Sequence, residues 1–63
     1  MSNPTPGERI AHLRRAIGLS QQELAKAAGI ARPNLAAVEA GSKPLFPKWR
    51  QRILTALAQH IDQ

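Results

Sequence analysis

Hydrophobic residues recur at intervals of three and four in four separate segments of the chain, which is the spacing of one helix face. In the first segment, Ile10, Leu13 and Ile17 form such a stripe. Residues 5–8 (TPGE) precede it with a threonine that can cap a helix, a proline suited to the first helical position and a glutamate that completes a capping box. Because Gly18 favours a helix end, we predict a first helix that begins after the Thr5 cap and stops at Gly18, and whose stripe faces a core.

The second segment is short and carries mostly small apolar residues. Residues 20–23 (SQQE) form another capping box. Leu24, Ala25 and Ala28 then give a narrow apolar face, and its small side chains allow another helix to approach closely. Gly29 ends this helix, since glycine tolerates the left-handed turn best.

A third helix is predicted over residues 31–40, with Leu35 and Val38 facing the core and Gly41 as its stop. Pro33 is compatible with this helix because it falls in the first turn, where its missing N–H would be unpaired anyway.

The last and longest helix is predicted from Pro47 to about Ile61, after a loop over residues 42–46. Strand signals are absent, because the chain has few β-branched residues and no alternating runs. The expected fold is therefore all-α, with four short helices or five. The apolar arc of the last helix is broad: a stripe of Trp49, Ile53, Leu57 and Ile61, interpreted as core, is widened by Leu54 and Ala58.

The composition indicates that this helical domain is small, basic and free of cysteine. The chain has 63 residues and a formal charge of +5. We expect residues 1–4 to be a disordered tail and residues 5–63 to form one domain. The charge fits a nucleic-acid partner, but a soluble basic surface explains it equally well. No apolar run is long enough to span a membrane and no signal-peptide pattern is present, so a cytoplasmic location is expected.

The second and third helices are joined by residues 29–31 (GIA), the spacing of a helix-turn-helix over residues 20–41. The stretch LSQQELAKAAGIARPNLAAVEAG, residues 19–41, strongly resembles the lambda-repressor-like (Cro or XRE type) family, and with the flanking helices the resemblance covers almost the whole chain. It implies a transcriptional regulator, a repressor, that binds double-stranded DNA sequence-specifically with the helix over residues 31–40 in the major groove.

The resemblance also implies roles for individual residues. Arg32, Pro33 and Ala37 match positions that contact bases, whereas Gln21 and Lys43 match positions that contact phosphates. The position of Gln21 agrees with physical expectation, because a helix N-terminus with free N–H groups attracts anions.

Other candidate roles rest on residue chemistry or on a structural match. Asn34 can reach a base or a phosphate. Lys48, Arg50 and Arg52 spread around the basic start of the last helix, and we expect phosphate contacts there from Lys48 and Arg50, although a solvated face is an equal alternative. Arg14 and Glu39 match a partly buried ion pair of the family, so we interpret them as structural.

The recognition helix is chemically sparse for this family, because its outward side consists largely of alanines flanked by Arg32 and Asn34. One half-site would therefore discriminate weakly. A chain of this size without cysteine or metal also lacks the usual stabilising links. We therefore predict a homodimer on an inverted-repeat operator. The relatives' dimer contact cannot be transferred, because the chain stops where many of them continue into a fifth helix. The candidate interface residues are Leu54, Ala58 and Ile61.

Enzymatic function is not expected, because the sequence has no nucleophile–base pair, paired carboxylates or phosphate-cradling glycine loop. His12 and His60 are far apart and have no ligand-like neighbours, so neither a metal nor a cofactor is predicted. The alternative function is an antitoxin-like or anti-repressor-like module that holds a protein partner through its apolar last helix.

Overall fold

The computed structural model describes residues 4–61, and within them the chain forms four helices and no strand, as predicted from the hydrophobic spacing. Most of the predicted disordered tail, residues 1–3, lies outside the described residues. The helices are α1 (Pro6–Ile17), α2 (Gln21–Ala28), α3 (Arg32–Ala40) and α4 (Pro47–Ile61).

Local sequence signals set the helix ends. The Thr5 hydroxyl accepts a hydrogen bond from the Glu8 N–H at 3.1 Å, and the Ser20 hydroxyl accepts one from the Glu23 N–H at 3.0 Å. Only the second of these caps is a complete box among the described hydrogen bonds, because the Glu23 carboxylate also accepts from the Ser20 N–H at 2.8 Å. The hydrogen bond from the Ser20 N–H, followed by the nearby Ser20 side chain, lowers the pKa of Glu23. The first three helices each end at a glycine with positive φ, a conformation that costs glycine little.

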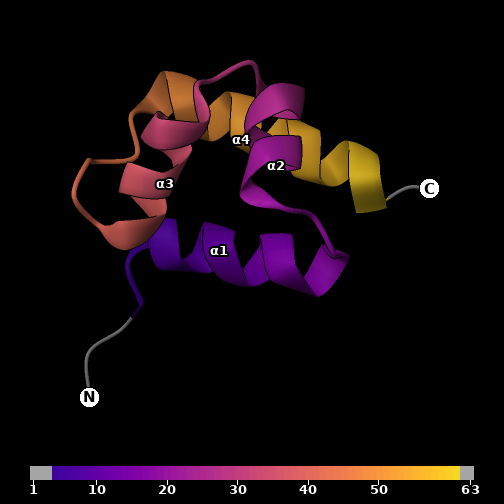
Figure 1. Cartoon of the computed structure of the whole chain (residues 1–63), viewed down its shortest axis with the longest axis horizontal. Helices are drawn as coiled ribbons and strands as arrows, with labels where there is room; N and C mark the ends of the chain where they lie inside the picture. The colour runs from indigo at the N-terminus through magenta and orange to yellow at the C-terminus, as the bar shows by residue number, and fades with distance from the viewer. Residues whose placement is uncertain (1–3, 62–63) are drawn as a thin grey trace.

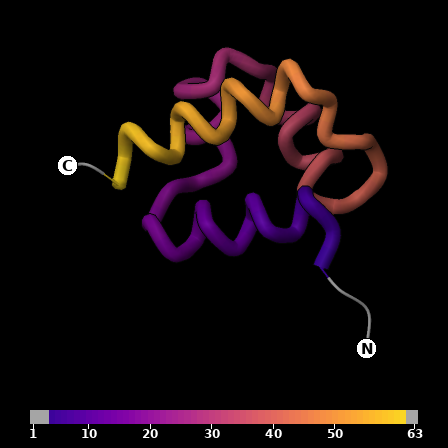
Figure 2. The backbone as a smooth tube through the Cα atoms, turned by 180° about the vertical axis from the view of Figure 1, so that it is seen from behind, coloured from indigo at the N-terminus to yellow at the C-terminus, as the bar shows by residue number. Residues whose placement is uncertain are grey.

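The helices enclose one core. Helix α2 packs against α3 and α4, while α1 packs against α3 and, less extensively, against α4. In Figure 1, α1 lies below α2 and α3, and α4 passes behind α2. The view from behind in Figure 2 has α4 in front of α2, with α1 running below α4. The core between them consists of Ile10, Leu24, Ala25, Ala28, Leu35, Ile53, Ala56 and Leu57, with Ile17, Leu19, Ile30, Leu45 and Trp49 packed against it.

The buried face of α1 differs from the predicted one. Leu13, predicted to face the core, is 45% exposed. The residues that α1 does bury are Gly7, Ile10, Ala11 and Arg14. Helix α1 approaches α3 along this row, which includes a glycine and a charged residue and was therefore not apparent as an apolar stripe. The prediction for Leu13 was wrong because α3 covers the neighbouring side of the helix.

The last helix shows a similar rotation of its buried face. Ile61, predicted as the end of the core stripe, is 63% exposed, whereas Ala56 is buried. The row of α4 that faces the core cluster includes Ala56, whose small side chain allows close packing, and does not include Ile61. Trp49 is half-buried against the core, and its ring meets that of Phe46 edge to face at a centroid distance of 5.0 Å.

Candidate nucleic-acid interface

The starts of α2 and α3 lie next to each other, which brings together two residues predicted for different DNA contacts. One guanidinium nitrogen of exposed Arg32 donates a long hydrogen bond of 3.5 Å to the side-chain oxygen of Gln21. The N–H groups of the first turn of α2 precede its internal hydrogen bonds and point out of the helix end. A phosphate at this end would therefore meet free backbone donors, an amide and an arginine together.

Gln21 is held in place from the protein side. Its amide nitrogen donates to a Glu39 carboxylate oxygen at 3.0 Å, and the residue is half-buried. A glutamine amide carries two N–H groups, so the bond to Glu39 leaves one of them for a ligand. The side chain thus links the interior of the domain to its surface at the head of α3.

Glu39 in turn belongs to a buried ion pair with Arg14. Arg14 Nε donates to Glu39 Oε2 at 2.8 Å, and a second guanidinium nitrogen donates to Oε1 at 2.9 Å. The third nitrogen of Arg14 donates to the Leu19 carbonyl at 2.9 Å, and both charged residues are 8% exposed. The structure therefore places the two residues in a bidentate pair that joins α1 to α3.

The protonation of this pair follows from its hydrogen bonds. Burial by itself raises the pKa of Glu39, but the hydrogen bonds from Arg14 and Gln21, with the nearby positive charges, outweigh burial and hold that pKa below its usual value. The hydrogen bond to Glu39 raises the pKa of Arg14. Both groups are consequently charged at neutral pH, and the described part of the chain leaves no buried side-chain N or O atom unpaired.

The outward side of α3 is sparse, as the sequence predicted. Arg32 and Pro33 are exposed at its start, and Ala37 is partly exposed one turn later. Asn34 is engaged by the following loop, because the Lys43 ammonium donates to its side-chain oxygen at 2.9 Å. A two-bond contact with adenine uses that oxygen as well as the amide nitrogen, so a base read by Asn34 would share this oxygen with Lys43 or displace it.

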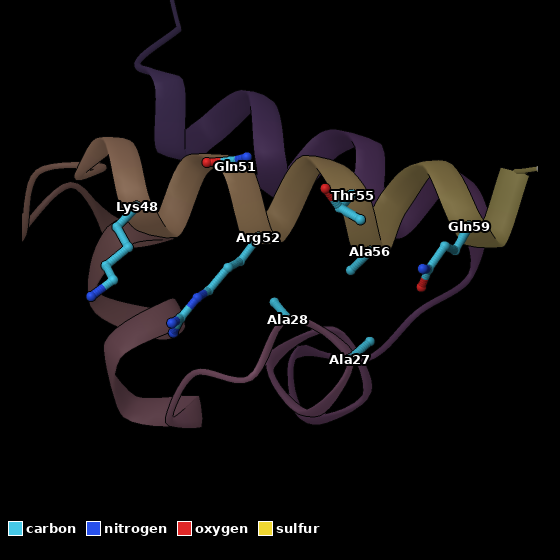
Figure 3. Close-up of a pocket in the computed structure, with 8 residues that line it drawn as sticks. All are labelled: Ala27, Ala28, Lys48, Gln51, Arg52, Thr55, Ala56 and Gln59. Carbon is cyan, nitrogen blue, oxygen red and sulfur yellow. The ribbon is translucent and has the colours of Figure 1, made fainter.

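The two basic residues predicted at the start of α4 lie on different faces. Lys48 lines a groove of about 430 Å³ between α4 and the end of α2, whereas Arg50 lines a hollow between α4 and α1. Figure 3 shows Arg52 extending from α4 to the same side as Lys48. Arg52 follows Lys48 by four residues in the sequence, and this spacing places both side chains on one helix face.

The candidate dimer residues are all exposed. Leu54 and Ile61 expose 41% and 63% of their surfaces, and Ala58 is exposed between them at helical spacing. They form one face of α4.

Within residues 4–61 no group of three or more His, Asp or Glu side chains is arranged to hold a metal ion. No helix in this range is long and apolar enough to cross a membrane. His60 is half-buried, with its Nδ1 2.9 Å from the Ala56 carbonyl oxygen.

Comparisons with known proteins agree with the geometry of α2 and α3. Residues 7–62 match the family model described as a helix-turn-helix domain, which is nearly the whole chain. Searches of curated proteins and of solved structures found no match.

Proposed function

Because the chain belongs to the helix-turn-helix domain family, we propose that it is a sequence-specific DNA-binding repressor with α3 in the major groove. The resemblance inferred from the sequence is confirmed at the level of this family, whose fold implies DNA binding and transcriptional regulation. Occupying an operator within a promoter would repress by excluding the polymerase.

The observation that carries the proposal is the contact between Gln21 and Arg32. Gln21 would bind a backbone phosphate at the start of α2, and the same side chain accepts a long hydrogen bond from Arg32 at the head of α3. Arg32 retains further N–H donors for a guanine, the commonest specific contact in the major groove. Pro33 and Ala37 would add apolar contacts, for example to a thymine methyl group.

Phosphate contacts on either side would fix the position of α3. Lys43 lies in the loop after α3, and its ammonium reaches back to Asn34, so it lies beside the recognition helix. Lys48 and Arg52 share one face of α4 and form the second candidate contact with the backbone. Arg50 is on the other side of that helix, and its proposed phosphate contact receives less support from this geometry.

We further propose that two copies act together. A bidentate arginine–guanine contact discriminates by about 1–3 kcal/mol, whereas specific binding exceeds non-specific binding by about 4–10 kcal/mol. One copy with a sparse recognition helix falls short of that range, and two copies on an inverted repeat double the discrimination. The exposed face of Leu54, Ala58 and Ile61 would join the copies, with half-sites about one helical turn apart.

Selection from random duplex DNA tests this function directly. We expect an enriched inverted repeat containing guanine in each half-site. Arg32→Ala should weaken binding to the selected site by about 1–3 kcal/mol and relax the preference at one base pair. Arg9→Ala is the matched control, because it removes the same charge from an exposed arginine outside α2 and α3. Equal affinity of the protein for all duplexes, with no enriched motif, would refute sequence-specific binding.

A further inference from the structure

A hollow of about 360 Å³ lies between α1 and α4, separate from the predicted DNA contacts on α2 and α3. Its apolar floor combines buried Ile10 with Leu13 and Leu54, which are 45% and 41% exposed. Half-buried Leu45, from the loop before α4, completes the floor. Leu13 is the residue that the sequence assigned to the core, so its exposure creates an apolar surface that the fold itself leaves uncovered.

The hollow does not include the recognition helix. Its lining comes from α1, α4 and the loop between α3 and α4, and none of it comes from α2 or α3. Figure 2 shows the side of the molecule along which α1 and α4 run, with α2 behind α4. A partner seated here would leave Gln21 and Arg32 free to meet DNA.

The charge around the hollow is of one sign. Arg9 and Arg50, both exposed, contribute to its lining, and no acidic side chain among the described residues does. Of the acids in residues 4–61, Glu39 is buried against Arg14 and Glu23 caps α2. The remaining one, Glu8, is on α1 but outside the lining.

The apolar floor and the two arginines together distinguish among the possible occupants of the hollow. A second copy placed symmetrically in the hollow would bring Arg9 and Arg50 near their own equivalents, and like charges oppose association. A DNA backbone would satisfy the two arginines but would leave Leu13 and Leu54 without an apolar partner. A helix with an apolar stripe bordered by acidic residues satisfies both the leucines and the arginines.

We propose that this hollow is a docking site for an acidic amphipathic helix of a partner protein. Apolar side chains of the partner, spaced at three and four residues, pack on Leu13, Leu45 and Leu54, and its carboxylates pair with Arg9 and Arg50. The proposal does not require DNA binding, although Arg50 and Leu54 of this hollow also belong to the proposed phosphate contact and to the proposed dimer face. It also gives a defined surface to the alternative function, a module that holds a protein partner. This surface is formed by α1 together with the last helix.

The probe for a binding test is a fluorescein-labelled, end-capped peptide with leucines at heptad positions a and d and glutamates elsewhere. Anisotropy titration should give saturable binding to the full chain, weakened about tenfold or more by Arg9→Glu with Arg50→Glu. Arg52→Glu with Lys48→Glu is the matched control, because it makes the same charge change on the opposite side of α4. This control should weaken binding less than threefold. Leu13→Ser tests the apolar floor and should weaken binding without loss of helical circular dichroism, because Leu13 is exposed.

Three results would overturn the proposal. Absence of saturable binding would remove the site. Equal weakening by both charge-reversal pairs, or equal binding of a scrambled peptide of the same composition, would reduce the effect to diffuse attraction by a basic protein. Displacement of the peptide by duplex DNA from the wild type, but not from Arg32→Ala, would place the peptide on the DNA-binding surface.

Discussion

Gly7 of α1 lies against the backbone carbonyl of Val38 in α3, so close that a Cβ added at Gly7 would overlap the Val38 oxygen. The two helices therefore touch through their backbones at this point. The contact brings Ile10, Ala11 and Arg14 of α1 toward α3 and turns Leu13 outward. One missing side chain thus determines which face of α1 is buried.

Gly7→Ala should destabilise the domain, against the usual trend. Alanine favours helix by up to about 1 kcal/mol over glycine at an unconstrained helical position. Here the added methyl group meets backbone that cannot rotate away, so we expect a net loss of about 1–3 kcal/mol. Urea denaturation followed by circular dichroism measures it. A variant as stable as the wild type would show that α1 and α3 do not approach this closely.

Glu39→Ala should be among the most destabilising single changes. It leaves the Arg14 guanidinium buried without its partner, which costs about 3–5 kcal/mol. A 63-residue domain has roughly 3–9 kcal/mol in total, so the variant should be largely unfolded or close to it. Glu8→Ala, at an exposed glutamate of α1, is the control and should change stability by less than about 1 kcal/mol. The double variant Arg14→Met with Glu39→Met removes both charges and should recover part of the lost stability. If this double variant is no more stable than Glu39→Ala, the loss does not come from an unpaired buried charge.

Acid should weaken the domain through Glu39. Its pKa is lowered in the folded chain and returns to about 4.3 on unfolding. The stabilisation is therefore fully present above that pH and is lost as the pH falls through the lower, folded pKa. The melting-temperature difference between wild type and Glu39→Gln should stay constant from about pH 7 to pH 5 and shrink below about pH 4. A constant difference down to pH 3 would mean that the folded and unfolded pKa values are alike. Glu23 also has a lowered pKa, but it is present in both proteins and its contribution cancels.

Lys43→Ala should weaken binding to all duplexes about equally. If its ammonium contacts a phosphate, the slope of log affinity against log salt concentration should fall in magnitude by about one. The variant also releases the Asn34 side-chain oxygen, so the preference at the base pair facing Asn34 is the second quantity to compare. A loss confined to one sequence would assign Lys43 to base recognition through Asn34. Gel-shift titrations at several salt concentrations provide both measurements.

Ile61→Glu should abolish cooperative binding to a full operator while preserving affinity for a half-site. Ile61 is 63% exposed and lies outside the α1–α4 hollow, so the change tests self-association without disturbing the core or the proposed peptide site. Leu54→Glu should impair both self-association and peptide binding, because Leu54 belongs to the proposed dimer face and also lines the α1–α4 hollow. Gln59→Glu, at an exposed residue that lines the groove between α4 and α2, should impair neither. Sedimentation of each variant with full and half operators separates these outcomes, and a wild type that binds both operators equally tightly as a monomer would contradict the dimer.

The sequence by itself determined where the helices begin and end and which family the chain resembles. Capping boxes, prolines in first turns and glycine stops act on neighbouring residues, so their effect is readable without knowing what the helix packs against. The spacing of the helix-turn-helix is likewise local, which is why residues 20–41 were recognisable from the sequence. The basic charge and the absence of cysteine are properties of composition and need no structure.

Only the tertiary structure decided which face each helix buries and which side chains meet. Several rows of a short amphipathic helix are almost equally apolar, and the partner helix selects among them. In α1 the selected row contains Gly7 and Arg14 and excludes Leu13, because α3 approaches at Gly7. The bond from Gln21 to Glu39 joins residues 18 positions apart and depends on how α2 lies against α3. Lys48 and Arg50 look equivalent in the sequence, but helix geometry and the packing of α4 between α1 and α2 place them on different faces.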